Sequence, residues 1–228
     1  MSKMKSYLDR LSALSLDQTM LDSDRLVLFL SGSSDITCAG LTAGQLDLLH
    51  AICPSGYSVV ASNFPFNQDF EHIEFPQVSL LSAAASNIIY YWHTILNPRF
   101  LKLLQEHLSP LLEAQEVVLV CKSSGVNMLT QWLEGLGEEN LPIRSLGNQV
   151  TLPRLRVIAL GPVSHLLLNQ KELELLVIKG KKDPYSRILD RHSADIQVDT
   201  DHYSYEYRED VKGIIYDWIR KSDKNRCD

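Results

Sequence analysis

An α/β fold, with a mostly parallel central sheet and helices on both faces, is predicted by three features of this 228-residue sequence. Short apolar runs rich in Val, Ile and Leu alternate with segments whose apolar residues recur at helical spacing. These runs are largely uninterrupted, which is typical of strands buried on both faces. No repeat or low-complexity linker divides the chain. We therefore expect a single domain over 1–228, with a helical lead-in at 1–20 and a polar tail at 222–228.

The first half of the chain contains two strand-like runs and three helical segments. Apolar residues at helical spacing make 1–20 a short amphipathic helix. The run at 26–30 is entirely apolar and precedes a flexible polar loop, so we expect a buried strand there. A helical pattern covers 45–52, and the next strand is expected over 57–62. The segment 86–112 is helical, and a proline interrupts it.

The second half of the chain adds further strands and a closing helix. Strands are expected at 117–120, 155–160 and 173–180, because each is a run of aliphatic and β-branched residues. The shorter stretch 195–198 is a sixth candidate. The helix at 210–221 presents apolar side chains every three or four residues. Right-handed crossovers would place the carboxyl ends of the strands along one edge of the sheet, where ligands bind.

The composition argues against several classes of function. Lys and Arg are mostly scattered in a chain of formal net charge −6, so we expect no nucleic-acid partner. No His or Cys pair has metal-ligand spacing and no nucleotide-binding glycine motif occurs, so neither a metal nor a cofactor is expected. The four cysteines suggest no disulfide framework, which favours a cytoplasmic location. No run resembles a signal peptide or approaches the ~20 apolar residues of a membrane span.

The strand expected at 117–120 ends abruptly in the small-residue stretch Cys121-Lys122-Ser123-Ser124-Gly125, and an apolar pattern of helical spacing follows. Such a turn lifts a serine off the sheet, beside helix N–H groups that favour negative charge. The stretch resembles the nucleophile elbow of the α/β-hydrolase superfamily, small-x-Ser-x-Gly, with Cys121 where glycine is usual. The resemblance implies that Ser123 is a nucleophile. The alternative is an ordinary strand-to-helix turn of a parallel α/β protein.

The same resemblance implies where the acid and the base lie, because the superfamily order is Ser, then Asp or Glu, then His. Asp183 follows the strand at 173–180 at the spacing with which the family presents its acid. His202 lies in the loop before the closing helix, where the family places its histidine. Asp183 also precedes a proline, so an ordinary turn residue is the alternative. His165 and His192 follow the elbow too, but neither occupies the expected position as well.

The resemblance also implies an oxyanion hole. Ser124, directly after the nucleophile, is expected to supply one N–H group, and Ser33, in the loop after the strand at 26–30, the other. Gly32 in that loop matches the glycine of the family's His-Gly pair and is expected at the substrate. Ser31 replaces the histidine of that pair. Neither this replacement nor the one in the elbow removes a group that does chemistry, but both leave room for an inactive relative.

The connection between the strands at 155–160 and 173–180 is too short for the cap domain that many relatives insert there. We therefore expect a site that is open or partly covered by 64–112. Phe64 and Phe66 are the candidates for substrate binding, and core packing is the alternative for most aromatic residues of this segment. The aromatic candidates for an acyl pocket are Phe64, Phe66, Phe70, Phe75, Tyr90, Tyr91 and Trp92.

Together these features predict a serine hydrolase that cleaves an ester or thioester through a Ser-Asp-His triad and an acyl-enzyme. The expected substrate is a small molecule or an acyl group bound to a carrier. Two alternatives stay open. One is a binding module with the same fold and no activity, because fold does not guarantee chemistry. The other is an acyltransferase that uses the same triad.

Overall fold

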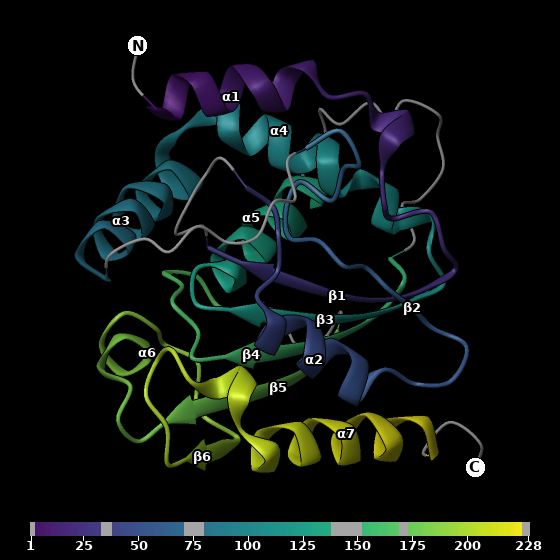
Figure 1. Cartoon of the computed structure of the whole chain (residues 1–228), viewed down its shortest axis with the longest axis vertical. Helices are drawn as coiled ribbons and strands as arrows, with labels where there is room; N and C mark the ends of the chain where they lie inside the picture. The colour runs from purple at the N-terminus through teal and green to yellow at the C-terminus, as the bar shows by residue number, and fades with distance from the viewer. Residues whose placement is uncertain (1–2, 33–37, 71–79, 138–151, 169–172, 225–228) are drawn as a thin grey trace.

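The computed structural model describes residues 3–32, 38–70, 80–137, 152–168 and 173–224. In this part of the chain six strands form one parallel sheet in the order β2-β1-β3-β4-β5-β6, which confirms the expected α/β fold (Figure 1). The strands are β1 (Arg25–Ser31), β2 (Ser58–Val59), β3 (Glu116–Lys122), β4 (Arg154–Leu160), β5 (Glu174–Gly180) and β6 (Ile196–Val198).

Helices precede, connect and follow the strands, and they flank the sheet. The α-helices are α1 (Lys3–Ala13), α2 (Ala43–Ile52), α3 (Leu80–Leu96), α4 (Pro98–Leu108), α5 (Gly125–Gly137), α6 (Pro184–Ile188) and α7 (Glu209–Lys224). Within the described ranges, short 3-10 helices accompany them: η1 (Leu16–Gln18), η2 (Ser109–Glu113) and η4 (Tyr205–Tyr207).

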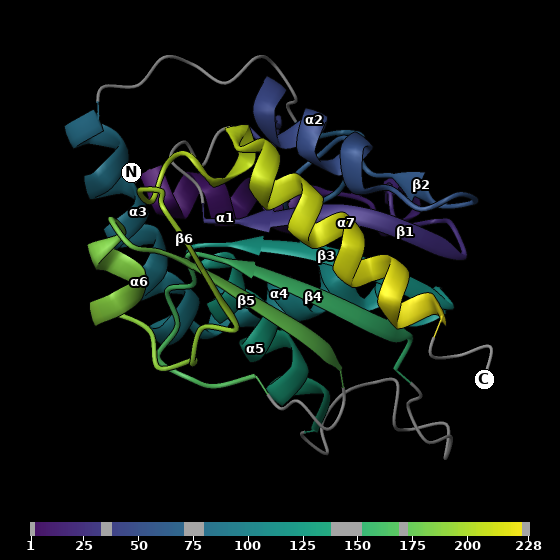
Figure 2. The same cartoon turned by 90° about the horizontal axis from the view of Figure 1, so that it is seen from below.

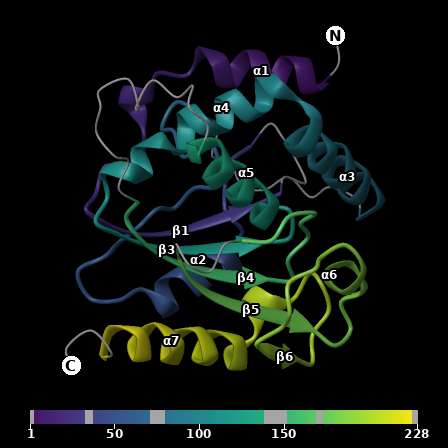
Figure 3. The ribbon, with the colours of Figure 1, turned by 180° about the vertical axis from the view of Figure 1, so that it is seen from behind.

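Two helical layers cover the sheet. Helices α4 and α5 pack on one face, with α1 outside α4, while α2 and α7 cover the other (Figures 1 and 2). Every residue of the central strand β3 is buried, as its run of Val and Leu predicts. Helices α3 and α6 lie at the end of the molecule toward which the strands point (Figure 3). The edge where the strands end is therefore flanked by these two helices.

Some elements differ from the sequence prediction. Strand β2 has only two residues, because the chain leaves the edge of the sheet and turns inward to bury Phe64 and Phe66. Helix α6 was not expected, and α7 continues to Lys224 into the predicted polar tail. Within the described ranges, no helix is both long enough and apolar enough to cross a bilayer. The cytoplasmic location stays a prediction.

The strand order reverses between β1 and β3. From β1 the chain moves outward to β2 and then returns past β1 to form β3, after which it continues in the opposite direction. In open parallel sheets, ligands bind outside the carboxyl ends of the strands at such a reversal. Gly32 directly follows β1, and Ser123 directly follows β3. The topology thus brings two of the sequence-predicted residues to the same crevice.

Candidate active site

Ser123 lies at the tip of a strained turn between β3 and α5. Its φ is 55°, in the left-handed region that residues other than glycine rarely adopt. Two backbone hydrogen bonds join the turn to a distant segment: the N–H of Ser123 donates to the carbonyl of Leu160 at 3.2 Å, and its own carbonyl accepts the N–H of Val163 at 3.0 Å. Both partners come from the end of β4 and the residues after it. The neighbouring strand therefore fixes the conformation of this serine.

The small residues on either side of Ser123 have separate structural reasons. A Cβ atom on Gly125 would lie 2.0 Å from the carbonyl oxygen of Leu30 in β1, so a larger residue would force the backbone apart. Glycine therefore lets the start of α5 pack directly on β1. Cys121 is fully buried in β3, and burial raises the pKa of its thiol. Cys121 is a protonated core residue in the place where the superfamily pattern usually has glycine.

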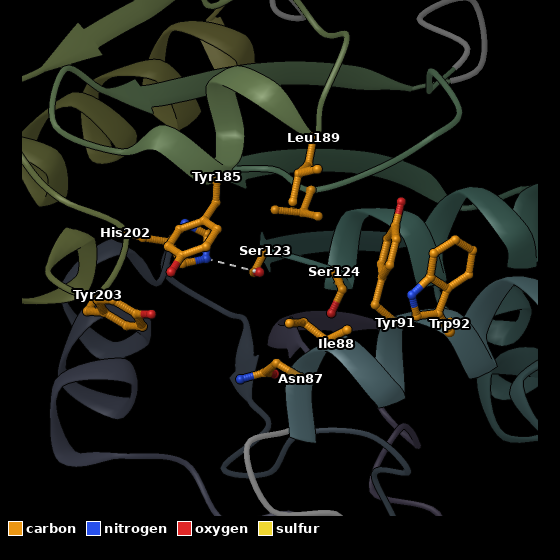
Figure 4. Close-up of a pocket in the computed structure, with 11 residues that line it drawn as sticks. Asn87, Ile88, Tyr91, Trp92, Ser123, Ser124, Tyr185, Leu189, His202 and Tyr203 are labelled. Atoms are coloured by element: carbon orange, nitrogen blue, oxygen red, sulfur yellow. Dashed lines mark hydrogen bonds between the residues drawn. The ribbon is translucent and has the colours of Figure 1, made fainter. Parts of the chain in front are cut away.

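Three of the sequence-predicted residues form a hydrogen-bonded row. His202 Nε2 lies 3.1 Å from Ser123 Oγ (Figure 4). On the other side of the ring, His202 Nδ1 lies 2.9 Å from Asp183 Oδ2. Because an ionised carboxylate only accepts hydrogen bonds, Nδ1 carries the proton and Nε2 is left to accept the proton of the serine hydroxyl. The side chain of Asp183 is fully buried, and that of His202 is 11% exposed. This arrangement can activate a serine hydroxyl as a nucleophile.

Asp183 is held by donors on both of its carboxylate oxygens. Oδ1 accepts the backbone N–H groups of Tyr185 and Ser186 at the start of α6, at 3.0 and 3.2 Å. Oδ2 accepts His202 and the hydroxyl of Tyr205, the latter at 2.8 Å. Burial raises the pKa of Asp183, but His202 and the other donors outweigh this effect and bring the pKa below its ordinary value. The carboxylate therefore stays ionised at neutral pH and remains a pure acceptor.

Tyr205 is a site residue that the sequence analysis missed. It is fully buried, and its hydroxyl donates to Asp183 and accepts the N–H of Gly180 at 2.6 Å. Tyr203 and Tyr207 flank it in the sequence, and both are well exposed. The three tyrosines occupy every second position, and the sequence pattern does not indicate which of them is buried. Only the approach of η4 to the end of β5 selects Tyr205.

The two other histidines after the elbow have different partners. His165 Nδ1 lies 2.7 Å from the amide oxygen of Asn127 in α5. His192 Nδ1 lies 2.7 Å from Asp190, and its Nε2 accepts the backbone N–H of Leu168 at 3.0 Å. His192 therefore belongs to a second Asp–His pair, but the nitrogen that a base would use is already bound to the backbone.

The expected oxyanion hole is only partly within the described residues. Ser124 is nearly buried, and no hydrogen bond among the described residues uses its backbone N–H, which leaves this group available to an oxyanion. A Cβ atom on Gly32 would lie 2.0 Å from Ser124 Oγ, so glycine there makes room for the Ser124 side chain. Ser33, the second expected donor, lies outside the described residues. The oxyanion hole stays a prediction.

A pocket of about 310 Å³ opens beside Ser123. Ile88, Tyr91 and Trp92 of α3 line one side of it, and Tyr185 and Leu189, in and directly after α6, line another (Figure 4). Among the described residues, no three His, Cys, Asp or Glu side chains are grouped in a way that would hold a metal ion.

Phe64 and Phe66 do not line this pocket, which corrects the expectation that they bind substrate. Both are buried, and the ring of Phe64 packs against Phe100 and His107 of α4 at centroid distances of 6.0 Å. The segment after β2 turns beneath α4 instead of toward the pocket. Of the other aromatic candidates, Tyr91 and Trp92 line the pocket. Phe70 and Tyr90 are buried core residues. Phe75 lies outside the described residues.

No protein-family model matches the chain, and no curated protein matches it significantly. Among solved structures, it is similar to a dienelactone hydrolase-like promiscuous phosphotriesterase from metagenomic libraries, with a TM-score of 0.51 and 10% identity over 87% of this chain and 84% of that one. Esterase B from Lactobacillus rhamnosis gives a TM-score of 0.42 at 14% identity, over 89% of this chain and 76% of that one. An esterase from Pyrobaculum calidifontis gives 0.40 at 11% identity, over 90% and 78%. The first similarity, together with the strand order, shows that the chain has an α/β-hydrolase fold.

Proposed function

We propose that this protein is a serine hydrolase that cleaves carboxylic esters or thioesters through an acyl-enzyme. The observation that carries the proposal is the hydrogen-bonded row from Ser123 through His202 to Asp183. A serine hydroxyl is a weak nucleophile until an adjacent base takes its proton, and the base works best when a third group orients it. The left-handed conformation of Ser123 supports the same role, because backbone strain of this kind concentrates at functional sites.

The proposed reaction begins when Ser123 Oγ bonds to the acyl carbon and its proton passes to His202 Nε2. Asp183 stabilises the resulting imidazolium and fixes the ring orientation. The negative charge that develops on the acyl oxygen is stabilised by the N–H of Ser124, and one such donor is worth roughly 3 kcal/mol in the transition state. The bond to the leaving oxygen or sulfur then breaks, and the leaving atom takes the proton from Nε2.

Water completes the cycle by the same route in reverse. A water molecule gives one proton to His202 Nε2 while its oxygen attacks the acyl carbon bound to Ser123. The bond from that carbon to Ser123 Oγ breaks, and Oγ takes the proton back from Nε2. The carboxylic acid leaves, and the free hydroxyl is restored.

Covalent labelling tests the nucleophile directly. The purified protein is treated with a fluorophosphonate probe, and the modified residue is mapped by mass spectrometry. We expect one label on Ser123, no label on Ser123→Ala, and most of the labelling retained in Ser124→Ala, because only the backbone N–H of Ser124 is assigned a role. Label on Ser124 that survives Ser123→Ala would instead move the nucleophile by one residue.

Turnover assays then separate the proposal from its alternatives. Matched esters and thioesters with the same acyl group are compared, with and without an added alcohol or amine. Free carboxylic acid as the main product supports the hydrolase. A product that carries the acyl group on the added acceptor identifies an acyltransferase. A folded protein that takes no probe and turns over neither substrate is a binding protein with an α/β-hydrolase fold.

A further inference from the structure

Apolar side chains around the pocket are held in contact with solvent. Ile88 and Trp92 of α3 are 60% and 55% exposed, and Leu189 after α6 is 49% exposed. Tyr90, from the same helix, is 1% exposed and belongs to the core. All three exposed side chains line the pocket (Figure 4). Apolar side chains gathered at one opening indicate a surface that is covered when a ligand binds.

No Asp, Glu, Lys or Arg is among the described residues that line the pocket, so these residues offer a charged substrate no carboxylate, ammonium or guanidinium group to pair with. Burial, together with Tyr185 and the carboxylate of Asp183, raises the pKa of Tyr203 to about 12, and burial also raises the pKa of Tyr91. Both phenols are therefore uncharged at neutral pH. A charged group in this pocket would lose its hydration without gaining an ionic partner. The lining favours an uncharged substrate.

The position of the base divides the pocket into two sides. His202 must give its proton to the leaving oxygen, so the leaving alcohol lies on the His202 side of Ser123. Tyr203 is on that side, whereas Trp92 is beyond Ser124, away from the histidine (Figure 4). The acyl chain must extend away from the leaving group. It is thus directed toward α3.

We propose that the substrate is an uncharged ester or thioester with an apolar acyl chain, which packs against Ile88, Tyr91 and Trp92 while the leaving group departs past Tyr203. This inference rests on the proposed serine hydrolase function and adds its substrate class. The volume of about 310 Å³ has room for roughly ten water-sized groups, so an acyl chain of about six carbons fills the α3 side.

An acyl series on a constant leaving group tests the inference. We compare kcat/KM for p-nitrophenyl acetate, butyrate, hexanoate and octanoate. Each buried methylene is expected to raise kcat/KM by about fourfold, which gives roughly a two-hundredfold increase over the four methylenes from acetate to hexanoate. Octanoate is expected to gain little beyond hexanoate, because the chain then extends past the pocket.

Two neighbours on α3 provide a matched pair of variants. Ile88 lines the pocket, whereas Ile89 is similarly exposed, at 56%, and does not line it. Ile88→Ala is expected to lower kcat/KM for hexanoate about three- to tenfold and to leave acetate within twofold. Trp92→Ala is expected to have the same effects. Ile89→Ala is expected to leave kcat/KM unchanged for both substrates. Thermal melts of each variant verify that the fold is intact.

The outcomes distinguish this inference from the function on which it rests. A wild-type preference for long acyl chains that Ile88→Ala weakens and Ile89→Ala preserves supports it. If Ser123 takes the fluorophosphonate label but the acyl series is flat or favours acetate, the apolar acyl site is wrong while the hydrolase stands. If Ile88→Ala and Ile89→Ala lower kcat/KM for hexanoate equally, the assignment of the acyl site is also wrong. A protein without label or turnover overturns both proposals.

Discussion

Lys122 and Glu206 form a buried ion pair, with Nζ 2.7 and 2.6 Å from the two carboxylate oxygens. Lys122 is the last residue of β3 and directly precedes Ser123. Glu206 lies in η4, directly after Tyr205, whose hydroxyl binds Asp183. The side chains of the pair are only 11% and 5% exposed. The pair therefore ties the turn that carries the serine to the segment that follows the histidine loop.

Breaking this pair is expected to reduce both stability and turnover. Glu206→Gln leaves Lys122 without its charge partner, which costs about 3–5 kcal/mol for a buried pair. Because the pair positions the elbow relative to the histidine loop, we expect kcat to fall more than KM rises. Urea unfolding and steady-state kinetics measure the two effects. Lys102→Met, which removes an exposed ion pair in α4, is the control and should change stability by less than about 1 kcal/mol.

His202 should be the only one of the three downstream histidines whose loss removes turnover without unfolding the chain. His202→Ala removes the group that we propose accepts the proton of Ser123, whereas His165→Ala and His192→Ala should keep turnover per folded molecule. His192→Ala should lower the melting temperature, because it removes a buried imidazole that contacts both Asp190 and the backbone N–H of Leu168, and that N–H is left without its acceptor. Circular dichroism verifies folding. Near-wild-type turnover in His202→Ala would refute the assignment of the base.

The same assays should show an acidic limb in the pH profile. A general base accepts a proton only in its neutral form, so kcat/KM should rise with pH as the imidazole loses its proton. The lowered pKa of Asp183 keeps that carboxylate ionised well below neutral pH, so its protonation should not produce the limb. A rate that is independent of pH between about 5 and 8 would contradict a histidine base.

Asp183 should also make stability depend on pH in a defined direction. Its pKa is lowered in the folded protein from the ordinary 3.8, so the stabilisation that the ionised carboxylate contributes is fully present above pH 3.8. This stabilisation is lost as the pH falls through the lower pKa that the group has in the folded protein. The difference in melting temperature between wild type and Asp183→Asn should therefore be constant near neutrality and shrink below about pH 4. Tyr205→Phe, which removes one donor, should move this loss to higher pH. A difference that grows on acidification would contradict the assignment.

Gly125 and Gly213 should respond to alanine in opposite ways. Alanine at 125 would place its Cβ 2.0 Å from the carbonyl oxygen of Leu30, whereas alanine at 213 in α7 meets nothing within 4 Å. We expect Gly125→Ala to destabilise the protein by more than about 2 kcal/mol through backbone displacement. Gly213→Ala should stabilise it by roughly 0.5–1 kcal/mol, because alanine favours the helix. Urea unfolding compares the two, and an unchanged midpoint for Gly125→Ala would contradict the close packing.

The sequence was most informative where local pattern and topology determine position. Buried parallel strands require continuous apolar runs, so the main strands were recognisable, and their carboxyl ends necessarily share one edge. Ser123, Asp183 and His202 each follow a strand, which is why the order of motifs along the chain sufficed to select them. Helix α6 also had a local signal, since Asp183 followed by proline is a common helix start.

Other parts of the site depend on contacts between distant segments. Phe64 and Trp92 are both aromatic residues in apolar surroundings, and only the packing of α4 and α3 decides that one is core and the other lines a pocket. The inward turn of Tyr205 and the ion pair of Glu206 likewise depend on where η4 meets the ends of β5 and β3. The periodicity of one segment does not indicate which distant segment it contacts, so the roles of these residues could not be predicted from the sequence.

The left-handed conformation of Ser123 creates a trade-off between thermal stability and the proposed turnover at a single position. A non-glycine residue in this region costs of order 1–3 kcal/mol, and glycine would relieve most of it. In a protein of this size, 1 kcal/mol corresponds to about 2–4 °C in melting temperature. A laboratory lineage selected only to survive heating would therefore be expected to accept glycine at 123 and lose the proposed nucleophile. Selection for thermostability in this protein must include turnover in every round, because a substitution that relieves this strain also removes the proposed nucleophile.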